Sequence, residues 1–170
     1  MIRRALGFLG GEGFGDNKFP LSLLLRCFFF QKIFLFNRHV DWPVHWSSKV
    51  VDPGKIVRGN RCPGLSYGCH LDGRNGIVFG NNVWVGPRVS VISMNHNVND
   101  FSRYTEDKPI RIGKDSWLAT NSVILPGVEL GEHTIVAAGC VVNRSFPEGN
   151  QVLAGVPAKV IKKLDSYYCE

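Results

Sequence analysis

The longest regular pattern in this chain is an aliphatic residue at every sixth position between Ile112 and Ser145. Four residues after nearly every aliphatic position stands a small or β-branched residue. The aliphatic positions are Ile112, Leu118, Ile124, Leu130, Val136 and Val142, and the small positions are Ser116, Ser122, Val128, Thr134 and Cys140. An ordinary half-buried strand alternates with a period of two, so a period of six indicates a different architecture.

A six-residue period predicts a short strand followed by a turn. Three such units close one triangular coil of about 18 residues, and coils stack at the strand spacing of about 4.8 Å. The aliphatic residue points into the prism, and the small residue fits the crowded space beside it. A glycine after the aliphatic residue, as at Gly113 and Gly131, is expected to tolerate the turn. One coil cannot bury its own apolar face, so the pattern predicts an all-β parallel β-helix of several coils.

The same period continues toward the N-terminus and is interrupted once. It is carried by Leu65, Leu71 and Ile77, and after a two-residue offset by Phe79, Val85 and Val91. From Asn95 to about Pro109 the chain is polar and aperiodic, and 21 positions separate Val91 from Ile112. Because 21 is not a multiple of six, we expect a loop extruded from the coil near 95–109. Such insertions in a solenoid often carry the function.

We divide the chain into an N-terminal segment (1–47), a β-helix (48–151) and a C-terminal capping segment (152–170) with a short helix. Residues 1–18 are rich in glycine, and we expect weak structure there. Residues 19–36 are apolar on nearly every side, which predicts a helix too short for a comfortable membrane span. Packing on another subunit or on the β-helix is favoured. The alternative is a membrane interface, with Arg26 and Lys32 reaching lipid phosphates.

Composition limits the cellular location of the protein and the class of ligand it binds. The five cysteines form no Cys-x-x-Cys pair, and their odd, scattered number indicates reduced thiols and a cytoplasmic location. The inner face of the membrane is an alternative location, through residues 19–36. The net charge of +6 is dispersed rather than clustered with aromatic residues, which disfavours nucleic acid and suits a small polyanionic ligand. No secretory signal is evident.

His96 is the best candidate for a catalytic residue. It stands at the start of the one polar insertion, flanked by Asn95 and Asn97. A solenoid needs no histidine at the root of a loop, so a functional role is favoured over an ordinary surface position. A histidine of unperturbed pKa about 6.5 is largely neutral at cytosolic pH and can accept a proton. That chemistry suits a general base acting on a hydroxyl or amine that attacks an activated carbonyl.

Three segments carry a resemblance to a known family: FGNNVWVGPRVSVISMNHN, KPIRIGKDSWLATNSVILPGV, and IVAAGCVV followed by AGVPAKVIKKL. They resemble the hexapeptide-repeat, left-handed β-helix acetyltransferases, in particular the sugar O-acetyltransferases related to galactoside, maltose and xenobiotic acetyltransferases. Trp42-Pro-Val-His45 is similar to O-acetyltransferases of polysaccharide gene clusters. The resemblance implies a left-handed coil, acetyl coenzyme A as co-substrate, a saccharide acceptor, and a homotrimer with its sites between neighbouring β-helices.

The resemblance also implies roles for individual residues. His96 is the base, and the backbone N–H of Thr120 meets the thioester oxyanion. Coenzyme A contacts are implied for Trp117, Ala138, Asn143, Lys159, Lys162 and, with less support, Lys163. We expect His70, Asp72 and Asn95 to face the acceptor. Each role has a structural alternative: in that reading the tryptophan covers a coil corner, and the lysines form an ordinary solvated face. The galactoside enzymes carry an acceptor-binding Asn near the place where this chain has Gly68 to Asp72, so the acceptor is not specified.

The sequence therefore predicts an acetyl coenzyme A-dependent O-acetyltransferase acting on a saccharide hydroxyl, in polysaccharide biosynthesis. Transfer is expected to be direct, because no Ser or Cys stands beside a base in a nucleophile pattern. Two alternatives stay open: acetylation of the amine of an amino-sugar nucleotide, and a non-catalytic assembly scaffold. A zinc enzyme of the β-helical carbonic anhydrase type needs three histidines. Phe101 stands five residues past His96, where that enzyme type has a histidine, so we expect no metal site.

Overall fold

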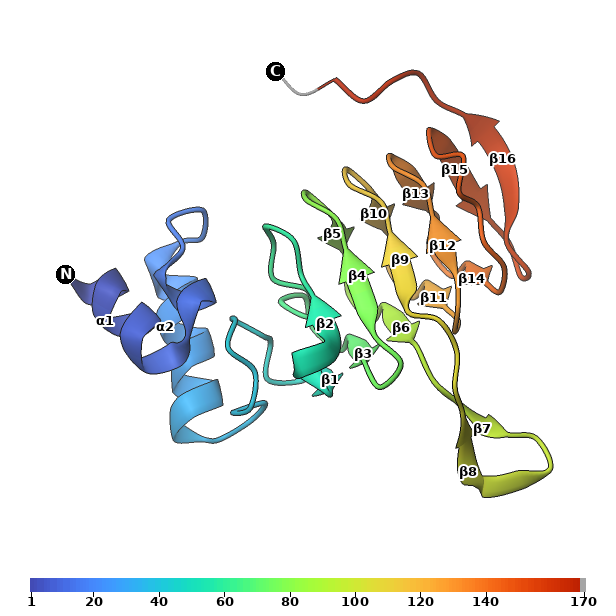
Figure 1. Ribbon diagram of the computed structural model, residues 1–170. Helices are drawn as coiled ribbons and strands as arrows, with labels where there is room; N and C mark the ends of the chain where they lie inside the picture. Colours follow the sequence, from blue (N-terminus) through green and yellow to red (C-terminus); the bar gives the residue numbers. More distant parts are fainter. Residues whose placement is uncertain (169–170) are drawn as a thin grey trace.

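The computed structural model describes residues 1–168, so Cys169 lies outside the described residues. Figure 1 shows an N-terminal pair of helices, a stack of coils, a hairpin that projects from the stack, and a C-terminal strand at its far end. The helices are α1 (Ile2–Gly10) and α2 (Leu21–Phe28), with short turns η1 (Glu12–Gly15), η2 (Phe29–Ile33) and η3 (Pro53–Lys55).

The stack has three faces of parallel strands. The first face contains β1 (Lys49–Val51), β3 (His70–Asp72), β6 (Ser90–Ile92), β11 (Val123–Ile124) and β14 (Val141–Val142). The second contains β2 (Ile56–Val57), β4 (Ile77–Phe79), β9 (Ile110–Ile112) and β12 (Glu129–Leu130). The third contains β5 (Trp84–Val85), β10 (Trp117–Leu118), β13 (Thr134–Val136) and β15 (Gln151–Ala154), with β16 (Lys159–Lys163) at its edge. This architecture confirms the predicted left-handed parallel β-helix.

The repeat positions form the core of the prism. All six aliphatic positions from Ile112 to Val142 are at most 2% exposed, and all five small positions are buried as well. Trp117 pairs with Ile135, and Leu118 pairs with Val136, in the register of one 18-residue coil. The interpretation of the six-residue period as strand plus turn is therefore confirmed.

The reason why glycine follows the aliphatic positions differs from the one predicted. A Cβ on Gly113 would lie 2.4 Å from the backbone nitrogen of Glu132, and one on Gly131 would lie 2.3 Å from the carbonyl oxygen of Pro147. These glycines are required because the next coil approaches closely, not because their turn needs a left-handed backbone. The left-handed conformation falls on corner residues instead, such as Asn121 with a φ of 59°.

The N-terminal segment is more ordered than its glycine content suggests. The prediction of weak structure for residues 1–18 is wrong, because Leu6 and Phe14 are buried in a second apolar cluster with Leu24 and Cys27 of α2. Helix formation in residues 19–36 is confirmed: α2 continues through a π-helical turn to Ile33. Packing against α2 thus stabilises a structure in residues 1–18 that their glycine-rich composition does not predict.

One side of the segment 19–36 packs on the first coil. The side chain of Gln31 is fully buried; its Nε2 donates to the Trp42 carbonyl at 3.1 Å, and its Oε1 accepts from the Val44 N–H at 2.7 Å. The other side leaves Leu25, Phe29 and residues 33–36 exposed. Within residues 1–168 no helix combines the length and the hydrophobicity needed to cross a bilayer. Contact of this exposed side with a membrane stays a prediction.

The C-terminal segment is a strand pair, which corrects the predicted short helix. Strand β15 continues the third face with Gln151 and Leu153 pointing inward, and β16 pairs with it antiparallel. The segment from Val152 to Leu164 reads as helical in isolation, but the open edge of the third face offers unpaired backbone groups. Pairing along that edge satisfies them and decides the structure.

Stability is expected to depend on the inward positions. Leu118 is fully buried at the centre of the stack, so Leu118→Ala should lower the free energy of unfolding by about 2–5 kcal/mol through lost burial and a residual cavity. Arg111→Ala, at an exposed position of β9, is the control and should change it by less than about 0.5 kcal/mol. Denaturant titration measures both. Equal stabilities of the two variants would contradict the assigned core.

Candidate functional site

The predicted loop near 95–109 contains a two-stranded hairpin. Strands β7 (Asn95–Asn97) and β8 (Asp100–Thr105) pair antiparallel and project from the corner between the first and second faces (Figure 1). His96 is the direct cross-strand partner of Tyr104, and their ring centroids lie 4.6 Å apart. Every residue of β8 is exposed. The hairpin therefore presents His96 to the surroundings of the coil rather than to its core.

The imidazole of His96 is held in one tautomer. Its Nδ1 lies 2.6 Å from the carbonyl oxygen of Phe101. A carbonyl oxygen only accepts, so Nδ1 carries the proton in this contact, and in the neutral ring Nε2 keeps its lone pair. An exposed Nε2 with a lone pair is the group that general-base chemistry requires.

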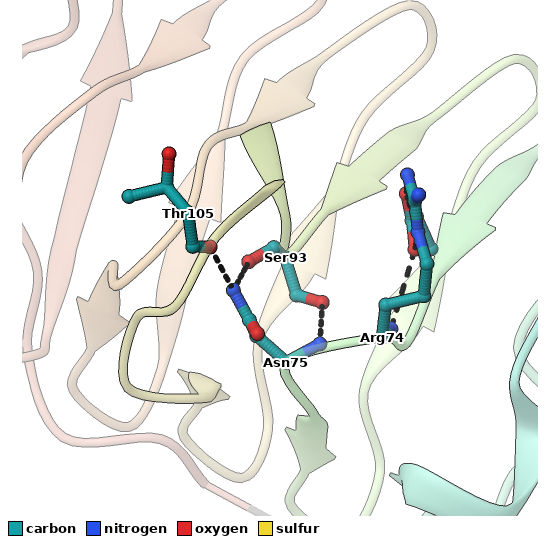
Figure 2. Close-up of polar contacts among 5 residues, drawn as sticks. Arg74, Asn75, Ser93 and Thr105 are labelled. Carbon is teal, nitrogen blue, oxygen red and sulfur yellow. Dashed lines mark hydrogen bonds and ion pairs between the residues drawn. The ribbon is translucent and has the colours of Figure 1, made fainter. Parts of the chain in front are cut away.

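The turn after β3 holds the root of the hairpin. The side-chain amide of Asn75 donates to the carbonyls of Ser93 at 2.9 Å and of Thr105 at 3.0 Å, and its backbone N–H donates to the Ser93 hydroxyl at 2.9 Å (Figure 2). Arg74 forms a two-pronged ion pair with Asp72, with a shortest distance of 2.6 Å. Burial alone would raise the pKa of Asp72, but the hydrogen bonds and charge of Arg74 outweigh it and hold that pKa below its usual value.

The three predicted acceptor residues occupy different environments. Asn95 is exposed beside His96, at the start of β7. His70 is half-buried in β3. Asp72 is 3% exposed at its side chain, and Arg74 binds both carboxylate oxygens. An acceptor would have to break that ion pair to reach Asp72. The structure therefore favours a role for Asp72 in holding Arg74 over direct binding of the acceptor.

A second group of candidate residues lies on the third face. Trp84 of β5 and Trp117 of β10 are direct strand partners, and both are about half exposed. Together with Ile135 and Tyr167 they line a pocket of about 460 Å³. Sequence reasoning singled out Trp117 but missed Trp84. The signal was present, because each tryptophan immediately precedes an aliphatic repeat position.

Thr120 and Ala138 meet at the corner between the third and first faces. The backbone N–H of Gly139 donates to the Thr120 carbonyl at 3.0 Å, which places the two turns in adjacent coils. Within residues 1–168 the N–H of Thr120 donates no hydrogen bond to another residue. It packs close to Gly86 of the preceding coil, and it stays a candidate donor for the oxyanion role.

The remaining predicted coenzyme A contacts are dispersed. Asn143 follows β14 and lies at the corner of the hairpin, away from the turn of Ala138. Lys159, Lys162 and Lys163 lie on β16, beside the third face. Lys163 is paired with Glu148 at 2.5 Å, whereas Lys159 and Lys162 are exposed. The structure therefore gathers Trp117, Thr120 and Ala138, and leaves Asn143 on the other side of the coil.

The four cysteine thiols within residues 1–168 are poor candidates for a nucleophile. Cys27, Cys62, Cys69 and Cys140 are buried and unbridged. Burial raises the pKa of each thiol, that of Cys62 to about 12, so the thiolate form is scarce near neutral pH. Over the described part of the chain, no three side chains of His, Cys, Asp or Glu gather as a metal site.

Comparison with known proteins agrees with the hexapeptide-repeat fold. Residues 109–144 match the family model for the bacterial transferase hexapeptide (six repeats). A Saccharomyces cerevisiae protein, provisionally named an acetyltransferase, is 39% identical over 98 residues, which cover 55% of this chain and 48% of the relative. Galactoside O-acetyltransferase of Escherichia coli is 34% identical over 92 residues, covering 52% and 44%.

Among solved structures, a hexapeptide-repeat acetyltransferase from Vibrio cholerae aligns with a TM-score of 0.53 and 25% identity, covering 71% of this chain and 72% of that one. The chain spans about half the length of the curated relatives it matches. The residues that the family model matches, 109–144, lie within the β-helix.

Proposed function

We propose that this chain, whose residues 109–144 match the bacterial transferase hexapeptide model, is an acetyl coenzyme A-dependent O-acetyltransferase acting on a saccharide hydroxyl. The observation that carries the proposal is the exposed imidazole of His96, whose Nδ1 is bound by the Phe101 carbonyl. A histidine held in this way has its second nitrogen ready to accept a proton. The saccharide assignment is supported by the likeness to a galactoside O-acetyltransferase.

The reaction is a direct transfer. Nε2 of His96 removes the proton of the acceptor hydroxyl while its oxygen attacks the thioester carbonyl. The new C–O bond forms, the C–S bond breaks, and the coenzyme A thiolate leaves and takes up the proton from His96. Negative charge develops on the carbonyl oxygen, where the N–H of Thr120 stabilises it by a few kcal/mol. No acyl-enzyme is needed, in keeping with the buried thiols.

The residues of the third face have the chemistry that coenzyme A requires. The exposed Trp117 offers an apolar surface to the pantetheine arm, and the exposed Ala138 leaves room beside it. Lys159 and Lys162 provide two ammonium groups for the nucleotide phosphates. Because these ammonium groups are exposed, their contribution to affinity is expected to weaken as salt increases.

The placement of the two groups supports a site shared between subunits. His96 projects from the corner of the first and second faces, whereas Trp117 lies on the third face of the same chain (Figure 1). One chain therefore does not bring the base to the thioester. A ring of three copies, each presenting its hairpin to the third face of the next, completes three equivalent sites. Trimer formation is part of the proposal.

Labelled acetyl coenzyme A tests the proposed activity against a panel of free sugars, nucleotide sugars and lipid-linked glycans. The expected product is an acetyl ester, which mild alkali cleaves. An alkali-stable amide formed only with amino sugars would contradict O-acetylation. Absence of transfer to every acceptor, together with no release of coenzyme A, would support the scaffold alternative.

A further inference from the structure

A continuous series of contacts joins the core of the first face to His96. It begins at Asp72, which is buried in β3 and binds the Arg74 guanidinium through Nε at 2.9 Å and Nη2 at 2.6 Å. The guanidinium carbon of Arg74 lies 4.5 Å from the ring centroid of Tyr104. Tyr104 in turn packs against the imidazole of His96, with 4.6 Å between ring centroids.

A second set of contacts fixes the hairpin strand that carries Tyr104. The Asn75 amide binds the Thr105 carbonyl at the end of β8 and the Ser93 carbonyl just before β7, so one side chain holds both ends of the hairpin (Figure 2). Because every residue of β8 is exposed, apolar burial does little to fix this hairpin. The hairpin is instead held by the hydrogen bonds of Asn75 at its root and by the contact of Arg74 with the Tyr104 ring.

We propose that Arg74 and Asn75 are positioning residues for His96, Arg74 through the ring of Tyr104 and Asn75 through the backbone of Thr105. This inference rests on the proposed role of His96 as the base. Proton transfer requires Nε2 to lie within hydrogen-bond reach of the acceptor hydroxyl, and an imidazole on an exposed hairpin rotates out of reach unless its ring is supported. The ion pair to the buried carboxylate of Asp72 transmits the rigidity of the coil to that ring.

The planar, two-pronged geometry of Arg74 matters as much as its charge. A guanidinium binds both oxygens of Asp72 and stacks flat on an aromatic ring at the same time, whereas an ammonium group does neither. Removing the Arg74 side chain alone leaves the buried Asp72 carboxylate without a compensating charge, with the backbone N–H of residue 74 as its remaining hydrogen-bond donor, which endangers folding. The test therefore replaces both members of the pair and also changes the stacked ring separately.

The test variants are Tyr104→Leu and the double variant Asp72→Asn/Arg74→Leu. Tyr104→Phe keeps the ring, and Arg103→Ala removes an exposed arginine of the same hairpin whose ion pair within residues 1–168 is with Asp100. Coenzyme A release from acetyl coenzyme A, with galactose as the acceptor probe, gives kcat and KM. Both test variants are expected to lower kcat about tenfold with KM for acetyl coenzyme A nearly unchanged, because orientation rather than binding is lost. Tyr104→Phe should restore kcat, and Arg103→Ala should match the wild type.

Nitrogen-15 spectra of the imidazole give a readout that does not depend on turnover. The wild type is expected to show His96 as a single Nδ1–H tautomer, and Tyr104→Leu to show a mixture. A kcat of Tyr104→Leu equal to wild type, with His96→Ala inactive, would overturn the positioning role and leave the base assignment intact. If His96→Ala is fully active, the proposed function fails; an unchanged tautomer signal in Tyr104→Leu would then overturn the positioning role as well.

Discussion

Replacing His96 by alanine is expected to lower kcat by about 10²–10⁴-fold, the usual contribution of a general base. Without the imidazole, the acceptor hydroxyl must lose its proton to water while it attacks the thioester. Because His96 is exposed and lies outside the β-helix core, its replacement is expected to leave the fold intact. Initial rates of coenzyme A release at saturating substrate measure the effect.

Asn99→Ala is a matched control for this change. Asn99 is also exposed on the hairpin, in the turn between β7 and β8, and its side chain makes no recorded hydrogen bond within residues 1–168. Its replacement is expected to leave kcat within about twofold of wild type, because surface changes away from special features have small effects. An active His96→Ala enzyme with unchanged kcat would refute the base assignment.

Mixing two inactive variants is expected to restore activity. His96→Ala lacks the base, and Trp117→Glu places a negative charge where the polyanionic coenzyme A should lie. If each site takes His96 from one subunit and Trp117 from its neighbour, random trimers from equal amounts contain both intact halves in about a quarter of their sites. Co-refolding the two purified variants and measuring coenzyme A release tests this directly.

The control for the mixing experiment carries both changes in one chain. Mixed with either single variant, the double variant His96→Ala/Trp117→Glu supplies no missing half, so the mixture should stay inactive. Failure of the two single variants to complement each other, with trimers present by light scattering, would show that both halves of the site come from one chain. The intersubunit arrangement would then be wrong.

The sequence alone determined the coil and the place of its interruption. Inward positions such as Leu118 and Val136 must be aliphatic because they fill a closed prism, and that requirement repeats with every turn of chain. The extruded loop was equally visible, because an insertion breaks the period between Val91 and Ile112; its pairing as a hairpin was not. His96 stood out for the same reason: it is a titratable side chain where the repeat needs none.

Only the tertiary structure decided which side chains share a corner. Ala138 and Asn143 are five residues apart in the chain, yet one lies beside Thr120 and the other at the corner of the hairpin. A coil turns by a third of its circuit within one six-residue unit, so proximity in sequence does not imply a shared face. The support of His96 by Arg74 likewise depends on the folded hairpin, which brings Tyr104 against the Arg74 guanidinium.

The fate of the C-terminal segment was also decided by its surroundings. Residues from Val152 to Leu164 read as a short helix when considered alone, but backbone pairing along the free edge of the third face places them in β15 and β16. The repeat is readable in the sequence because each coil encloses the same space, so each inward position needs a side chain of similar size. The other features depend on contacts between segments that are distant in the sequence: which side chains lie at the same corner, which strand pairs with the edge of the third face, and what supports His96. These contacts exist only once the coils have stacked.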